Sequence, residues 1–327
     1  MKTLARSILE LVQEASSGWN RFWFTPQAPH TLSLIRILVG LMLFYTHLVW
    51  ALDLNSFLGS DSWVSRPAWD AVNVDAYVWS YLWLVESPTV LWMLHVAALG
   101  VFALLTVGYR SRLMAVLAWF ISVNYCHRLT GALFGLDQIN VMLVMYLMLG
   151  ENGAAYSVDW LRQMRRNESP CDPVEPTAAV GTNIAIRLIQ IHLCLVYFFG
   201  GIAKMHGTAW WDGSATWMAV ANYEYQSLDM TWLAHYPLLT AFLTHVTMLW
   251  EAYYCFLVWP RVTRPVVLFV AVCVHIGIAV SLGMATFGLV MLIANVAFIS
   301  PCVVRRLVPW WQQVDLIHLS TPGVRTA

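Results

Sequence analysis

Residues 184–204 read IAIRLIQIHLCLVYFFGGIAK, an apolar run interrupted by an arginine, a glutamine and a histidine before it closes on a lysine. A helix of about 20 apolar residues crosses the hydrocarbon core of a bilayer. Further apolar stretches occupy residues 32–52, 88–107, 112–129, 132–149, 237–259, 265–281 and 284–304. The pattern predicts an all-α, polytopic integral membrane helix bundle of about eight transmembrane helices. A count of about seven or nine stays open, because two of the stretches are nearly continuous.

The composition supports this class and excludes others. Of 327 residues, 59% are hydrophobic and 11% are charged, and the mean hydropathy is +0.63. A soluble domain carries about 25% charged residues, and disordered chains are poor in aromatic residues. The 18 tryptophans suit a protein with two membrane–water interfaces. The 18 basic and 18 acidic residues balance without a basic tract, so we expect no nucleic-acid partner.

The placement of arginine indicates the orientation in the membrane. With the N-terminus inside, most arginines fall in the inner loops, as the positive-inside rule requires. We therefore expect both termini to be cytoplasmic in a multi-pass protein of the bacterial inner (plasma) membrane. The expected organisation is an N-terminal amphipathic, interfacial segment at 1–30, a transmembrane domain at 31–305 and a short cytoplasmic tail at 306–327.

Ionisable groups inside membrane spans are expensive and are candidates for function. Lys204 is one of only two lysines, the other being Lys2, whereas arginine serves as the cation elsewhere. It closes the fifth span next to Gly200-Gly201, where backbones can approach closely. A buried lysine can lose its proton and act as a base. The alternative is a lysine that extends to the outer membrane surface.

Other polar residues inside the spans are weaker candidates. Asp137 and Asn140 are three residues apart, hence on one helical face, and either line a polar pocket or form a structural contact between helices. His275 falls near the middle of its span and is either a ligand-binding group or a packed core histidine. Arg36 and Glu251 fall in the inner halves of their spans, where we expect them to form a structural pair.

Several kinds of site are not indicated. The ten histidines show no spacing typical of a membrane di-iron enzyme, so no metal is predicted. The sequence contains no G-x-S-x-G nucleophile motif. An inverted repeat and paired broken helices, which would favour a transporter, are not evident.

Three ordered blocks resemble a known family. The stretch VYFFGGIAKM at 196–205 resembles the region around the catalytic lysine of vitamin K-dependent gamma-glutamyl carboxylase. Tyr156-Ser157-Val158-Asp159 resembles a serine-valine-aspartate element of that enzyme, and VTRP at 262–265, followed by His275 and Gly283-Met284, resembles a third block. The wider group is the HTTM (horizontally transferred transmembrane) domain family, and the likeness covers roughly residues 30–305.

The resemblance implies a chemistry and roles. In the carboxylase, a lysine amine deprotonates reduced vitamin K, which reacts with oxygen to give a strong base. That base removes a γ-proton from a peptide glutamate, carbon dioxide adds, and an epoxide is the by-product. This implies lyase-type carbon–carbon bond formation, with reduced vitamin K or another quinone as cofactor. Lys204 and His275 would be catalytic, and the ligand would be positioned by Asp137, Asn140, Tyr197, Gly200 and Gly201.

The sequence also departs from the family. It shows no counterpart of the large lumenal region that recognises protein substrates, and Asp137 occupies the neighbourhood of a family histidine. The identity of the lipid-soluble ligand is therefore undecided, as is the presence of a peptide or protein substrate on the outer side. The alternative function is a non-catalytic membrane subunit or immunity-type partner that binds through aromatic outer loops, which include Trp210, Trp211 and Trp217.

Overall fold

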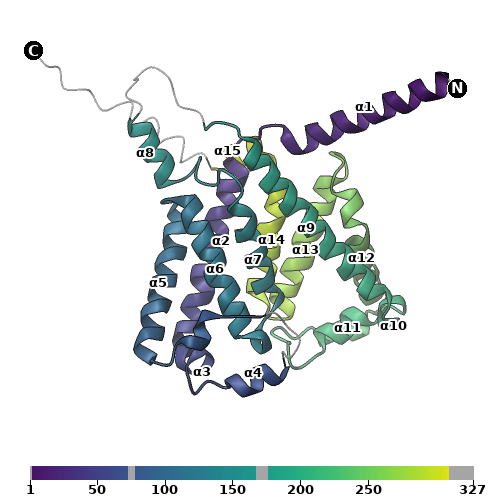
Figure 1. The fold of residues 1–327 in the computed structure, drawn as a ribbon. Coiled ribbons are helices and arrows are strands. Elements are labelled where there is room, and N and C mark those ends of the chain that lie inside the picture. Colours follow the sequence, from purple (N-terminus) through teal and green to yellow (C-terminus); the bar gives the residue numbers. More distant parts are fainter. Residues whose placement is uncertain (1, 73–77, 167–175, 309–327) are drawn as a thin grey trace, which may run out of the picture.

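The computed structural model describes residues 2–72, 78–166 and 176–308, and in these residues it contains helices and no β-strand (Figure 1). The predicted all-α class is confirmed. Gln27 and Ala179 form one isolated antiparallel bridge between their backbones. Most of the expected tail 306–327 lies outside the described residues.

Within the described ranges, the bundle is built from eight longer helices, and each corresponds to one of the predicted apolar stretches. They are α2 (His30–Trp50), α5 (Pro88–Val107), α6 (Ser111–Arg128), α7 (Gly135–Leu147), α9 (Val180–Met205), α12 (Pro237–Leu257), α13 (Arg264–Ser281) and α14 (Ala285–Asn295).

Other elements connect these helices or precede them. The α-helices among them are α1 (Lys2–Phe24), α3 (Leu54–Leu58), α4 (Arg66–Val72), α8 (Val158–Arg166), α10 (Thr208–Trp211), α11 (Ala215–Val220) and α15 (Pro301–Leu307). The 3-10 turns are η1 (Ala51–Asp53), η2 (Tyr81–Leu84), η3 (Thr130–Ala132), η4 (Thr231–His235) and η5 (Val296–Phe298).

Four helical stretches in the described part are long and apolar enough to cross a membrane, which supports an integral membrane protein. They are His30–Leu58, Pro88–Val107, Val180–Met205 and Arg264–Ser281. Helices α7 and α14 are apolar but shorter, at 13 and 11 residues. The count of eight spans and the cytoplasmic placement of the termini stay predictions.

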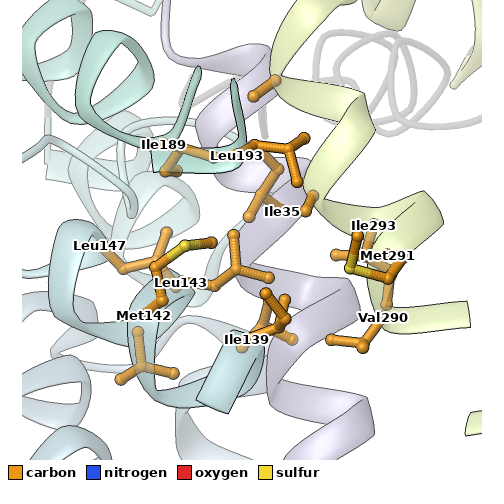
Figure 2. Close-up of a cluster of buried hydrophobic side chains, with 14 of the residues drawn as sticks. Ile35, Ile139, Met142, Leu143, Leu147, Ile189, Leu193, Val290, Met291 and Ile293 are labelled. Atoms are coloured by element: carbon orange, nitrogen blue, oxygen red, sulfur yellow. The ribbon is translucent and has the colours of Figure 1, made fainter. Parts of the chain in front are cut away.

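The short helix α7 lies in the hydrophobic core. Its residues Leu143, Val144 and Leu147 are completely buried. Figure 2 shows its side chains packed among Ile35 of α2, Leu193 of α9 and neighbours from α14. A helix surrounded by other helices needs little contact with lipid, which explains why α7 can be short.

Helix α1 extends away from the bundle and contacts it through its last turn (Figure 1). The side-chain amide of Asn183 donates to the carbonyl oxygens of Phe22 and Trp23 at 2.8 and 2.9 Å. The guanidinium of Arg187 lies 4.3 Å from the ring centre of Phe22. These contacts fix one end of α1, and the interfacial position of the rest stays a prediction.

Arg36 on α2 is completely buried. Its Nη1 donates to the carbonyl of Asn152 at 2.8 Å, and its Nη2 donates to the carbonyl of Tyr156 at 2.5 Å. Gly108, with φ +73°, lies against the same guanidinium, and a Cβ there would be 2.6 Å from Nη1. The expected pair of Arg36 with Glu251 is therefore wrong, because carbonyl groups of the 152–156 turn occupy the arginine.

Asp159, the last residue of the serine-valine-aspartate element, joins α8 to the turn between α5 and α6. Its carboxylate accepts from the backbone N–H groups of Arg110 and Ser111 at 2.8 and 2.7 Å, and from the Ser111 hydroxyl at 2.7 Å. Its own N–H donates to the carbonyl of Gly108 at 3.0 Å. In this structure the element holds a turn together.

We expect Asp159→Ala to lower the free energy of unfolding by about 2 kcal/mol, because three donors lose a charged acceptor. Thermal unfolding of the purified protein in detergent would show this as a lower Tm. The control is Asp70→Ala, which removes an exposed 2.8 Å ion pair with Arg66 and is worth about 0–1 kcal/mol. Equal shifts of Tm in the two variants would contradict the role of Asp159.

Candidate functional site

The ammonium of Lys204 on α9 lies 2.5 Å from Oε2 of Glu251 on α12. The two side chains are 26% and 11% exposed. Removing one partner of a fully buried ion pair costs about 3–5 kcal/mol, and the cost here is smaller because a quarter of the lysine side chain is exposed. The lysine therefore has a carboxylate partner on α12.

A close backbone contact between α9 and α12 brings Lys204 and Glu251 together. A Cβ on Gly201 would lie 2.5 Å from the backbone nitrogen of Ala252, so only glycine fits. A Cβ on Gly200 would lie 3.1 Å from Oε2 of Glu251. The predicted close approach of backbones occurs at Gly201, whereas Gly200 lies against the carboxylate of Glu251.

The pair lies well inside the bundle when measured along α12. Glu251 follows Pro237, the first residue of α12, by 14 residues, which is about 21 Å of helix. Helices α10 and α11 pack beside the first part of α12, where the Thr244 hydroxyl donates to the carbonyl of Gly213 at 3.0 Å. Lys204 closes α9, yet its neighbour α12 continues far beyond it.

The segment after α9 returns to cover the lysine. The Lys204 ammonium lies 5.3 Å from the ring centre of Trp210, and the indole N–H of Trp211 donates to the carbonyl of Met205 at 2.7 Å. Beyond them, hydrogen bonds from the Ser214 hydroxyl and backbone N–H hold the pKa of the exposed Asp212 carboxyl below its usual range. Trp210 belongs to the surroundings of Lys204, unlike a tryptophan of a separate binding surface.

Tyr197, about two helical turns before the lysine, is the centre of a buried hydrogen-bond network. Its hydroxyl lies 2.7 Å from Nε2 of His275 on α13 and accepts from Nδ2 of Asn295 on α14 at 2.9 Å. The Tyr254 hydroxyl on α12 donates to Oδ1 of Asn295 at 2.7 Å. The ring centres of Tyr197 and Tyr254 are 4.2 Å apart. The network thus joins α9, α12, α13 and α14.

The network assigns the protons of His275. Since Tyr197 already accepts from Asn295, the consistent arrangement has the Tyr197 hydroxyl donating to Nε2, and the imidazole proton then resides on Nδ1. Nδ1 of His275 is buried and has no hydrogen-bond partner among the described residues. A bound ligand with an oxygen atom at this position would satisfy the donor.

Two of the predicted site residues lie elsewhere. Asp137 accepts from the backbone N–H of Phe134 at 3.0 Å, at the start of α7. Asn140 is buried, and its Oδ1 has no partner among the described residues. Among the residues that the structure describes, neither Asp137 nor Asn140 forms a hydrogen bond or ion pair with Lys204 or Glu251. The structure brings together Lys204, Tyr197, Gly200, Gly201 and His275.

Two residues of the site are not found by sequence reasoning, and a third is given the wrong partner. Asn295 lies within an apolar stretch, and a search for ionisable groups passes over it. Tyr254 resembles any other tyrosine of an apolar helix. Glu251 stands out in the sequence but is assigned to the wrong cation there, since its partner depends on the register between α9 and α12.

The site can hold and transfer a proton. A lysine beside a carboxylate in a water-poor place can pass its proton to that carboxylate, which leaves an uncharged amine and an uncharged acid. The adjacent tyrosine and histidine offer hydrogen bonds to a bound molecule. Arginine could not do the same, because its guanidinium stays protonated.

Gly201→Ala should separate α9 from α12 and destabilise the protein, because the new methyl group meets backbone atoms that cannot move aside. We expect a clear fall in Tm. Gly277→Ala on α13 is the matched control: nothing lies within 4 Å of the added Cβ, and alanine favours the helix by about 1 kcal/mol. A Tm for Gly201→Ala equal to that for Gly277→Ala would contradict the close contact.

No family model matches this chain, and no curated protein or solved structure matches it. The function is therefore inferred from the chemistry of the site and from the resemblance of the three sequence blocks.

Proposed function

We propose that the protein is an integral membrane enzyme of the HTTM type, in which the Lys204–Glu251 pair removes a proton from a lipid-soluble ligand. The proposed ligand is a reduced vitamin K or another reduced quinone, as the resemblance to vitamin K-dependent gamma-glutamyl carboxylase implies. The observation that carries the proposal is the 2.5 Å contact between Lys204 and Glu251, deep along α12.

The pair suits a base that works without water. Transfer of one proton from Nζ of Lys204 to Oε2 of Glu251 leaves an uncharged amine with a free electron pair. That amine then takes the proton of a ligand hydroxyl and becomes an ammonium again. The new ammonium stabilises the anion it has produced, and the low dielectric constant of the site strengthens this attraction.

The neighbouring polar groups fit a ring that carries oxygen atoms. Nδ1 of His275 is a buried donor without a partner among the described residues, and Tyr197 holds the opposite side of the imidazole at 2.7 Å. His275 would donate to an oxygen of the ring, and Tyr197 would fix the orientation of the imidazole. A reduced quinone would supply, with oxygen, the strong base required for carboxylation.

The finer assignments follow from the placement of the arginines and from the same resemblance. We place the protein in the bacterial inner membrane with Lys204 toward the outer side, and we expect a peptide or protein substrate to approach from there. Asp137 and Asn140 are not needed in this scheme, because neither contacts the Lys204–Glu251 pair in the described part of the chain.

Lys204→Arg should abolish the reaction while the protein stays folded, because arginine keeps the charge beside Glu251 but cannot become a neutral base. We expect a loss of at least about 100-fold, the usual contribution of a general base. The measurement is epoxide formed from a reduced naphthoquinone with oxygen and a glutamate-containing peptide, separated by chromatography.

Lys204→Ala and Glu251→Gln complete the series. Both should be inactive, and their Tm values report whether the fold is retained without the ion pair. Epoxide formation by Lys204→Arg at the wild-type rate would exclude the lysine as the base. A wild-type protein that forms no epoxide with any naphthoquinone tested would exclude the quinone chemistry.

A second candidate, a non-catalytic binding protein, is favoured by the exposed aromatic side chains that follow α11. Tyr223 is 92% exposed and Trp232 is 46% exposed. We expect Tyr223→Ser combined with Trp232→Ser to leave epoxide formation unchanged. If the protein is instead a non-catalytic binding protein, the double variant no longer restores the phenotype of a strain that lacks the gene, whereas Lys204→Ala restores it. Trp210 is unsuitable for this comparison because it contacts Lys204.

A further inference from the structure

A cavity lies apart from Lys204, where α2 ends and α7 begins, at the lower end of the bundle in Figure 1. Its volume is about 490 Å³. This falls within the range of about 300–1,000 Å³ that is typical of small-molecule sites. None of Lys204, Glu251, Tyr197 and His275 lines it. It is therefore a separate place in the molecule from the proposed proton-transfer site.

Two carboxylates from different parts of the chain line this cavity. Asp53 follows α2 and accepts from the Ser56 hydroxyl at 2.6 Å, and Asp137 lies in the first turn of α7. Neither forms an ion pair within the described part of the chain, and no lysine, arginine or histidine of that part lines the cavity. The nearby cation Arg128 is already engaged by Ser62 and by carbonyl groups.

The remaining wall is mostly apolar and rich in aromatic rings. Tyr45, Trp50, Phe57 and Phe134 all line it. Tyr45 and Phe134 are 53% and 58% exposed, so they stand at the rim. Aromatic faces attract organic cations, most strongly where water is excluded. A small hydrated metal ion would gain little from such a wall.

We propose that this cavity binds an amphipathic organic cation, such as a quaternary ammonium compound. Its charged group lies near Asp53 and Asp137, and its apolar part lies against Trp50 and Phe57. The charge of the two carboxylates decides between this occupant and a neutral lipid chain. An alkyl chain would fill the same wall but leave the half-buried carboxylate of Asp137 without a counter-ion at the edge of an apolar cavity, which is unfavourable, whereas Asp53 is exposed and adds its charge at the rim.

The test is equilibrium binding of radiolabelled tetraphenylphosphonium to the protein in nanodiscs of phosphatidylcholine, with empty nanodiscs subtracted. We expect saturable binding that unlabelled tetraphenylphosphonium displaces and that the neutral triphenylphosphine oxide does not. Asp53→Asn and Asp137→Asn should each weaken binding about tenfold, the effect of one nearby opposite charge in partly screened surroundings. The double variant should lose saturable binding.

The asparagine variants are suited to this test because they preserve local structure. In Asp137→Asn, the new side-chain amide still offers a carbonyl oxygen to the N–H of Phe134, and Tm values verify the fold. Asp229→Asn is the control, since Asp229 is exposed and does not line the cavity. Unchanged affinity in both single variants would overturn the proposal. Equal displacement by triphenylphosphine oxide would also overturn it, since the cavity would then select only for apolar rings.

Discussion

The contact of Gly201 with the backbone of Ala252 is the constraint from which the site follows. Without a side chain at this position, α9 and α12 approach so closely that the next turn of α9 places Lys204 directly against Glu251. Loss of either partner would leave the other charge without compensation, which costs most at Glu251, the more deeply buried of the two. The same approach brings the ring centres of Tyr197 and Tyr254 to 4.2 Å, with the rings tilted by 39°, and so positions the polar network beside the pair.

The bundle accommodates its buried cations in two different ways. Arg36 is surrounded by backbone carbonyls, and Arg128 lies 3.7 Å from the ring centre of Trp83 while its Nη2 donates to the Ser62 hydroxyl. Both guanidinium groups hold loops in place. Lys204 alone among the three faces a carboxylate. A guanidinium spreads its donors over several acceptors and stays charged, whereas a lysine beside a carboxylate can exchange a proton.

The hydrogen bonds around Tyr197 turn four helices into one polar centre. Asn295 uses both its amide nitrogen and its oxygen, toward Tyr197 and Tyr254, so its orientation is fixed. That fixes the tyrosine hydroxyl and, through it, the ring of His275. The network is connected except at Nδ1 of His275, which has no hydrogen-bond partner among the described residues. The cavity with Asp53 and Asp137 is lined by a different part of the bundle. Its charged side chains are carboxylates, which attract a cation.

The pattern of residue types was enough to predict the helical class and the positions of the helices, because hydrophobic runs of the right length require helices in a membrane-like interior. It also identified Lys204 and its two glycines, since a rare residue type and a small-residue pair are visible without coordinates. The partners of the charged groups depended on packing in three dimensions. Depth in the spans suggested Arg36 for Glu251, but depth along a helix does not give the direction in which a side chain points. The register between α9 and α12 placed Glu251 against Lys204, and the packing of α7 beside the end of α2 placed Asp137 in the cavity with Asp53. Both are set by packing between segments far apart in sequence, such as Gly201 and Ala252.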